Sequence, residues 1–121
     1  MKKYKPTTKT ELKKLVFTDG VKLYDIDTSL ITDMSKLFYE SKRKDFEGIE
    51  DWDVSNVTNM DSLFRQCEKL NQPFDKWNTS NVVNMEKTFF SCMKFNKPLN
   101  SWNVSNVENM DMMFYMAQSF N

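Results

Sequence analysis

Apolar residues recur along this chain in two alternating patterns, and each pattern predicts a different element. In the first, apolar side chains stand at i, i+3, i+4 and i+7, which is typical of a short amphipathic helix packed on one side. This pattern occupies residues 60–67, 85–92 and 110–117. An asparagine that can cap a helix precedes each segment: Asn59, Asn84 and Asn109. We therefore predict a short helix in each of these segments.

The second pattern is a short alternation of inward and outward positions around each tryptophan, which predicts a β-strand. Trp52, Trp77 and Trp102 are each followed two residues later by Val or Thr, on the same side of the expected strand. A proline comes shortly before the second and third tryptophans, where its missing N–H group is tolerated. Because one helix and one strand cannot bury an apolar face alone, neighbouring units must stack.

Together the two patterns form a repeat of 25 residues, which is the spacing of the tryptophans. Segments 52–76 and 77–101 are identical at 11 of 25 aligned positions, which chance does not produce. A degraded copy, 27–51, precedes them, and an incomplete copy, 102–121, follows them. The last copy is therefore expected to leave an open end.

Residues 1–26 differ from the repeat and predict a capping unit. Thr8 and Glu11 have the spacing of a capping box, and apolar residues follow them at helical spacing. We therefore predict one repeat domain over residues 1–121. Its expected fold class is α/β: a solenoid of short parallel strands and short helices, with an N-terminal helical cap and an open C-terminal end.

One motif keeps its spacing from the second full copy into the last. It reads Met85-x-x-x-Phe89-x-x-Cys92-x-x-Phe95-Asn96-x-Pro98-Leu99-x-x-Trp102-x-Val104-Ser105-Asn106-Val107-x-Asn109-Met110. With this motif the chain resembles the BspA-like leucine-rich repeat surface proteins, over residues 27–121. The resemblance implies a leucine-rich-repeat-like α/β solenoid, a bacterial cell surface, and attachment or protein binding by some members. It implies no catalytic residues.

Composition narrows the choice of partner mainly by exclusion. Seventeen basic residues balance 17 acidic ones, which argues against nucleic acid or an anionic membrane as the partner. The sequence has no histidine, so the commonest general base and zinc ligand is missing. No apolar stretch is long enough for membrane insertion, and no signal peptide follows Met1. We expect a cytoplasmic protein, or a cell-surface one if the sequence is a fragment.

Asparagines recur after each predicted strand and after each predicted helix. We expect their side chains to bond turn backbone and to form ladders along the solenoid, because buried turns must satisfy their polar groups. A glycan or peptide contact is the alternative. The positions are Asn56, Asn81 and Asn106 after the strands, and Asn71, Asn96 and Asn121 after the helices.

Three other sets of residues have a structural interpretation beside a functional one. Cys67 and Cys92 occupy one repeat position and are expected to be small buried hydrophobes; a disulfide is the alternative. The three tryptophans are expected in the core, although equal spacing also suits a sugar-binding aromatic ladder. The basic run 42–44 (Lys42, Arg43 and Lys44) is expected to be a solvated loop, with a phosphate or nucleic-acid site as the alternative.

The outward strand positions are the predicted recognition face. They are Asp25, Asp27, Asp51, Asp53, Lys76, Asn78, Ser101 and Asn103. The four aspartates of this set should cluster, because adjacent strands lie about 4.8 Å apart. Such a cluster suits a solvated face, a basic protein partner, or Ca²⁺ held by Asp25, Asp27, Asp51 and Asp53.

Constant inward positions and changing outward ones favour a non-enzymatic protein-binding or adhesion module without a cofactor. The alternative is a structural unit that self-associates as a homodimer, because Met110, Phe114 and Phe120 would lie near the uncapped C-terminal end. An enzyme is disfavoured, since no nucleophile has a matched base. A carboxylate pair such as Asp51 and Asp53 is the best remaining candidate for hydrolysis.

Overall fold

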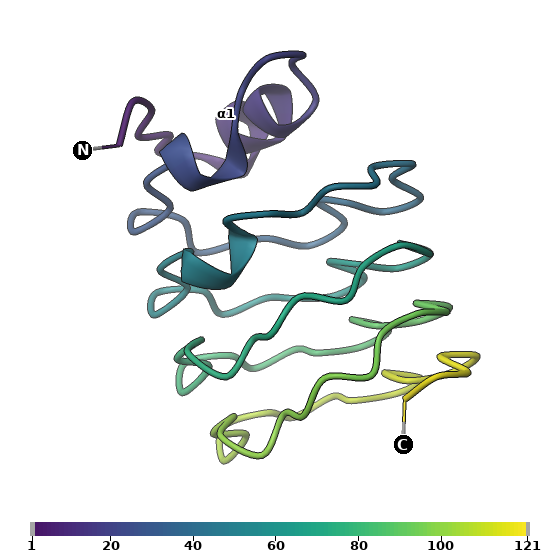
Figure 1. The fold of residues 1–121 in the computed structure, drawn as a ribbon. Coiled ribbons are helices and arrows are strands. Elements are labelled where there is room, and N and C mark those ends of the chain that lie inside the picture. The colour runs from purple at the N-terminus through teal and green to yellow at the C-terminus, as the bar shows by residue number, and fades with distance from the viewer. Residues whose placement is uncertain (1, 121) are drawn as a thin grey trace.

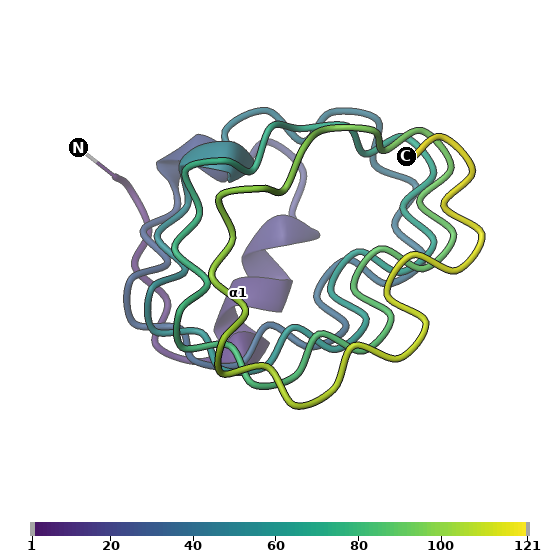
Figure 2. The same cartoon turned by 90° about the horizontal axis from the view of Figure 1, so that it is seen from below.

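The chain winds into successive coils that stack along one axis (Figure 1). The computed structural model describes residues 2–120. Seen along the stack, the coils lie over one another, with helix α1 (Lys9–Val16) behind them at the N-terminal end (Figure 2). Two short 3-10 helices, η1 (Leu23–Asp25) and η2 (Ile49–Asp51), are the other helices of the described residues. None of these helices has the length and apolar character that crossing a membrane requires.

The predicted α/β fold class is wrong. Between residues 2 and 120, α1 is the only α-helix, and no segment forms a β-strand or a sheet. The coils meet instead at isolated parallel bridges. These join Tyr4 to Ile26, Asp33 to Asn59, Asn59 to Asn84, and Asn84 to Asn109. The chain therefore does not form the expected leucine-rich-repeat-like solenoid of parallel strands and helices.

Overlapping turns replace the predicted helix at residues 60–67. Ser62 and Gln66 have positive φ angles of 57° and 63°, so the backbone alternates between right- and left-handed conformations. Leu63 N–H donates to Met60 O at 3.1 Å, a bond between residues i and i+3 that closes one turn. The next copies repeat this geometry, with positive φ at Lys87, Ser91, Met112 and Met116. The apolar spacing of a helix therefore also suits a chain of turns.

Alternate N–H groups in these turns donate to the following coil, and we call this array the turn ladder (residues 34–40, 60–66, 85–91 and 110–116). Met60 N–H donates to Asn84 O at 2.8 Å, and Phe64 N–H donates to Thr88 O at 3.0 Å. Every ladder bond runs in the same direction, with the N–H group in the earlier coil. Each peptide N–H group makes one strong hydrogen bond. An N–H group that donates to the next coil therefore cannot also make the i to i+4 bond of a helix.

Aromatic side chains fill the interior and continue from coil to coil. The rings of Phe38, Phe64, Phe89 and Phe114 form one column, with centroids 5.7–5.8 Å apart. The prediction that the tryptophans lie in the core is confirmed, since all three are buried. Each indole N–H donates to a backbone carbonyl of the preceding coil, as Trp77 Nε1 does to Ile49 O at 3.0 Å. The tryptophans thus satisfy their polar atom inside the core.

Helix α1 closes the N-terminal end of the stack. It begins after Thr8, whose Oγ1 accepts from Glu11 N–H at 3.2 Å, as predicted. The Glu11 carboxylate accepts from the N–H and hydroxyl of Thr7, where the capping box predicted the N–H of Thr8. Leu12 and Val16 face inward and are buried. The first coil is therefore covered, whereas the last coil is not.

Candidate functional site

The residues predicted as a recognition face do not line a strand. Half of them close tight turns, because each side-chain oxygen accepts the N–H group two residues further on, at 2.9–3.0 Å. These are Asp27, Asp53, Asn78 and Asn103. The side-chain and backbone hydrogen bonds from Ser29 hold the pKa of the Asp27 carboxyl below its ordinary value. These four residues stabilise the turns that carry them.

The other predicted face residues have separate partners. Asp25 is buried and pairs with Lys3 at 3.7 Å. Asp51 pairs with Lys76 at 3.6 Å on the surface, and Ser101 Oγ donates to Asp75 O at 2.8 Å. In the part of the chain that the structure describes, no group of three or more Cys, Asp or Glu is arranged to hold a metal ion. The four aspartates are therefore not gathered into one cluster, and Asp25 and Asp51 have separate lysine partners.

The asparagines after each tryptophan turn bridge neighbouring coils. Each Nδ2 donates to a serine carbonyl of the preceding coil, at 2.6–2.7 Å. The pairs are Asn56 with Ser29, Asn81 with Ser55, and Asn106 with Ser80. In the second set, Asn96 N–H donates to Asn71 Oδ1 at 3.0 Å, while Asn121 lies outside the described residues. These side chains thus join neighbouring coils by hydrogen bonds.

Replacing Asn81 by alanine should lower the free energy of unfolding by about 1 kcal/mol, because one bond between coils is lost. Urea denaturation followed by tryptophan fluorescence measures this change. Lys76→Ala is the control, since that side chain makes only an exposed ion pair. An Asn81→Ala variant as stable as the wild type would contradict a role in holding the coils together.

Cys67 and Cys92 are free and buried, which confirms the prediction of small buried hydrophobes over a disulfide. Each thiol donates to a phenylalanine carbonyl of the preceding coil, at 3.0 Å to Phe38 O and 2.9 Å to Phe64 O. Burial raises the pKa of both thiols, and that of Cys92 to about 12. Neither thiol is therefore a reactive nucleophile in the folded chain.

The raised thiol pKa values predict a loss of stability at alkaline pH. An unfolded cysteine titrates near pH 8.5, so above that pH the unfolded chain releases thiol protons that the folded chain keeps. Each thiol should then lower the free energy of unfolding by about 1.4 kcal/mol per pH unit, until the pH reaches the folded-state pKa. Urea denaturation between pH 7.5 and 10 measures this slope. The Cys67→Ala/Cys92→Ala variant should flatten this slope, because it has no thiols to titrate. It should still fold, since Ala117 fills the equivalent site in the last coil. An unchanged slope would refute the assignment of the slope to the thiols.

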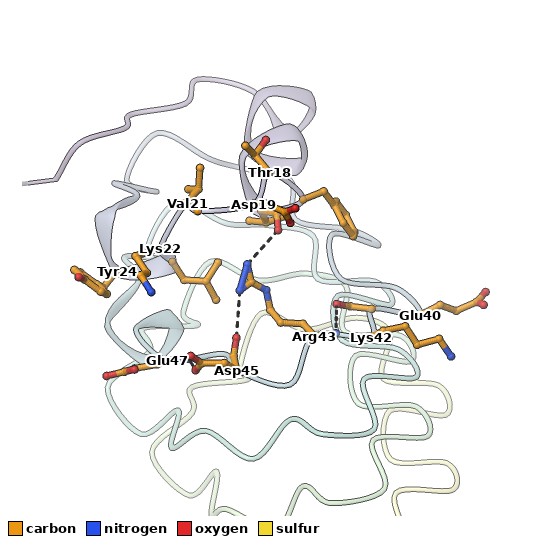
Figure 3. A pocket seen from close by; sticks show the side chains of 15 residues that line it. Thr18, Asp19, Val21, Lys22, Tyr24, Glu40, Lys42, Arg43, Asp45 and Glu47 are labelled. Carbon is orange, nitrogen blue, oxygen red and sulfur yellow. Dashed lines mark hydrogen bonds between the residues drawn. The ribbon is translucent and has the colours of Figure 1, made fainter.

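Lys42 and Arg43 of the basic run line a pocket of about 790 Å³ between the end of α1 and the connection at 40–47 (Figure 3). Arg43 donates from its guanidinium to Val16 O and Asp45 O, both at 3.2 Å. It therefore ties this connection to α1. Acidic and basic side chains both line the pocket: Asp19, Lys22, Glu40, Lys42, Arg43, Asp45 and Glu47. A pocket of mixed charge has no preference for a phosphate.

The last coil forms an open face of exposed apolar side chains. Of these residues, the sequence predicted only Met110 near the uncapped C-terminal end. We define this open face by Val104, Met110, Met112, Tyr115 and Met116, which are 41–53% exposed. Figure 2 views the stack from this end. The residues equivalent to Val104 and Met110 in the coil before are Thr79 and Met85, and they are 1% and 0% exposed. A following coil would cover this surface, as each earlier coil is covered by the next.

Two methionines of the open face depart from the repeat pattern. The position of Met112 is polar in each earlier copy, and so is the position of Met116. The residues at the first position are Lys36, Ser62 and Lys87, and those at the second are Glu40, Gln66 and Ser91. All of them share the positive φ angle of the two methionines. Exposed apolar side chains at positions that are polar in the other copies are typical of a contact surface, and the repeat alignment contained this signal.

The open face also has a row of N–H groups without acceptors. Met110, Met112, Phe114 and Met116 are the ladder donors of the last coil, and none of their N–H groups has an acceptor within residues 2–120. The equivalent N–H groups one coil earlier all donate to the last coil, at 2.8–3.0 Å. The final row is therefore ready to bond a further set of carbonyls.

A column of planar side chains along the outside of the ladder ends at this face. The guanidinium of Arg65 lies between the rings of Tyr39 and Phe90, 4.9 and 4.8 Å from their centroids. Phe90 stacks in turn on Tyr115 at 5.3 Å. Tyr115 is 53% exposed, so the column ends on an uncovered ring. Planar groups gain from stacking on such a ring.

The coils, the helical cap and the open face together define a repeat protein whose units pack against their neighbours. The chain belongs to the family described as Mycoplasma protein of unknown function, DUF285, which matches residues 10–121. No curated protein and no solved structure matches the chain. The resemblance to BspA-like surface proteins stays a prediction.

Proposed function

We propose that this chain is a non-enzymatic protein-binding module whose contact surface includes Met112 and Met116. The observation that carries the proposal is methionine at positions 112 and 116, where every earlier copy has a polar residue. Contiguous exposed apolar surface is costly in water and is typical of protein interfaces. Methionine side chains suit such a surface, because they are flexible and adapt to a partner.

The absence of histidine and the mixed charge of the pocket beside Arg43 support a binding role over catalysis. The open face also favours a protein over a nucleic acid, because the chain has no net charge and the face is mainly apolar. Attachment at a cell surface, which the BspA-like resemblance implies, is the setting that we propose for this binding.

The second candidate function is assembly, in which two copies of the chain bury their open faces against each other. The continuous apolar surface that includes Met110 and Phe114 favours it. Light scattering at increasing protein concentration tests this candidate. A mass that stays monomeric at high concentration would exclude the homodimer.

A paired set of variants tests the docking surface. Met112→Lys/Met116→Ser restores the residues of the preceding coil, and Lys76→Ala/Ser101→Ala changes the face that the sequence predicted. Proteins cross-linked to the full chain are identified, and each is then purified and titrated by calorimetry. The open-face variant should weaken the dissociation constant by about 10- to 100-fold, as loss of interface anchors does, and the other variant should leave it unchanged. The reverse result would refute the proposal. Circular dichroism checks that both variants fold.

A further inference from the structure

We propose that Arg65 binds a carboxylate of a protein partner, through the end of a guanidinium that is held between two aromatic rings. The rings are those of Tyr39 and Phe90, whose centroids lie 4.9 and 4.8 Å from the guanidinium carbon. This site adds a contact to the proposed function and needs neither Met112 nor Met116, because its residues belong to the three earlier copies of the repeat.

The chain has two arginines, and the fold uses the hydrogen-bond donors of only one of them. Arg43 donates to two backbone carbonyls, those of Val16 and Asp45. Within residues 2–120, Arg65 makes no side-chain hydrogen bond, and its Nε is buried without an acceptor. The five ion pairs of these residues are all made by lysines. The charge of Arg65 therefore has no partner in the described part of the chain, although buried polar groups normally have one.

The repeat alignment shows that arginine is the exception at this position. The equivalent residues of the other copies are all aromatic: Tyr39, Phe90 and Tyr115. A ring at position 65 would continue the column by stacking alone, as Phe90 does on Tyr115 at 5.3 Å. Arginine stacks as well, but it also carries a charge and donors that the described fold leaves unused. The departure from the repeat therefore favours a function for the hydrogen-bonding end of Arg65.

The surroundings of Arg65 determine which part of its guanidinium meets a ligand. The two rings cover its faces, and burial of Nε excludes contact along that edge. Between residues 2 and 120, Nε is the one buried side-chain nitrogen or oxygen without a partner. Because Nη1 and Nη2 make no hydrogen bond there either, they are open to solvent. Two N–H groups on one rigid plane fit the two oxygens of a carboxylate.

Stacking also prepares the guanidinium of Arg65 for binding. Contact on both faces restricts the torsions of its side chain, so less conformational entropy is lost when a ligand binds. The rings also exclude water from both faces of the guanidinium, and a charge-assisted hydrogen bond is stronger where water is partly excluded.

The neighbouring residues favour a carboxylate over a phosphate. Glu40 N–H donates to Arg65 O at 2.9 Å, so an acidic residue adjoins the site from the preceding coil. One guanidinium balances the single charge of a carboxylate, whereas a phosphate group carries nearly two charges and is repelled more strongly by Glu40. Gln66, the next residue of the coil, is exposed and uncharged. The ligand is therefore an Asp or Glu side chain, with apolar neighbours that pack against the rings of Tyr39 and Phe90.

The capped peptide Gly-Phe-Glu-Phe-Gly is the probe for this site, because it places one carboxylate between two apolar rings. It is titrated into the full chain, and NMR follows the Nε–H signal of Arg65 and the amides of Tyr39 and Phe90. All three signals should shift and reach saturation. The matched peptide Gly-Phe-Gln-Phe-Gly has the same shape without the charge. It should bind at least about tenfold more weakly, because a charge-assisted hydrogen bond is lost.

A pair of arginine variants makes the result specific to this site. Arg65→Gln should weaken binding of the Glu peptide at least about tenfold, measured from the amides of Tyr39 and Phe90. Arg43→Gln is the matched control and should leave the dissociation constant unchanged, because Arg43 serves the fold. Circular dichroism checks that both variants fold. If Arg65→Gln does not fold, the comparison of the two peptides on the wild type decides the question.

Four results would overturn the inference. The first is equal binding of the two peptides, or no saturable shift of the Arg65 signal with either. The second is tighter binding of inorganic phosphate at the same signal. The third is a Glu40→Gln variant whose Arg65 signal moves as far as the Glu peptide moves it, because Glu40 would then be an internal partner. The fourth is loss of peptide binding in Met112→Lys/Met116→Ser, which should bind like the wild type. Failure at Arg65 leaves the proposed contact at the two methionines to its own test.

Discussion

Replacing Phe64 by alanine should lower the free energy of unfolding by about 3–5 kcal/mol, as removal of a fully buried phenylalanine does. Phe64 stacks between the rings of Phe38 and Phe89, with centroids 5.8 and 5.7 Å away. Phe74 and Trp77 approach it at 5.3 and 5.9 Å. The cavity would therefore open between three coils, and each coil relies on its neighbours for its interior.

Urea denaturation followed by circular dichroism measures the effect of Phe64→Ala. Phe17→Ala is the matched control, because Phe17 is 55% exposed after α1 and its loss should cost less than about 0.5 kcal/mol. If the two variants lost equal stability, the aromatic column would not be the main source of cohesion between coils.

Gly48→Ala should be the second strongly destabilising change, at about 3 kcal/mol or more. Gly48 has a φ of 96° at the start of η2, and an added Cβ would lie 2.6 Å from Cβ and 2.7 Å from N of Tyr24. Since one of these atoms belongs to the backbone, the first two coils would have to move apart to relieve the clash.

Gly20→Ala separates the clash from the cost of the backbone conformation. Gly20 also has a positive φ, 87°, but no atom lies within 4 Å of an added Cβ. Its variant should lose only about 1–2 kcal/mol, the cost of a left-handed conformation. Thermal unfolding of both variants measures the difference. Equal melting temperatures would show that contact between Gly48 and Tyr24 adds nothing.

The sequence predicted which residues face inward better than it predicted the backbone that places them. Met60, Leu63, Phe64 and Cys67 are all buried, as their spacing required. Their backbone is not helical, because Ser62 and Gln66 adopt positive φ angles. Neither residue type is typical of that conformation, so no local signal indicated it. The hydrogen bonds that favour this conformation are made to the next coil, and the sequence of a single segment does not reveal them.

The residues predicted as outward strand positions lie in turns instead, for a reason that the sequence did contain. Asp53 and Asn78 are each followed two residues later by serine, a spacing typical of turns closed by an Asp or Asn side chain. The alternation around the tryptophans suggested strands instead. The open face was foreseen only as an uncapped end, although the change to methionine at positions 112 and 116 was visible in the alignment of the copies.

The cap and the coils also determine an order of assembly during synthesis. Within residues 2–120 no hydrogen bond joins positions more than 29 apart. Helix α1 is translated before the coils that stack on it, and each later coil leaves the ribosome when the surface it packs against is already present. We therefore expect the nascent chain to fold progressively from its N-terminus, with each newly completed coil serving as the template for the one that follows.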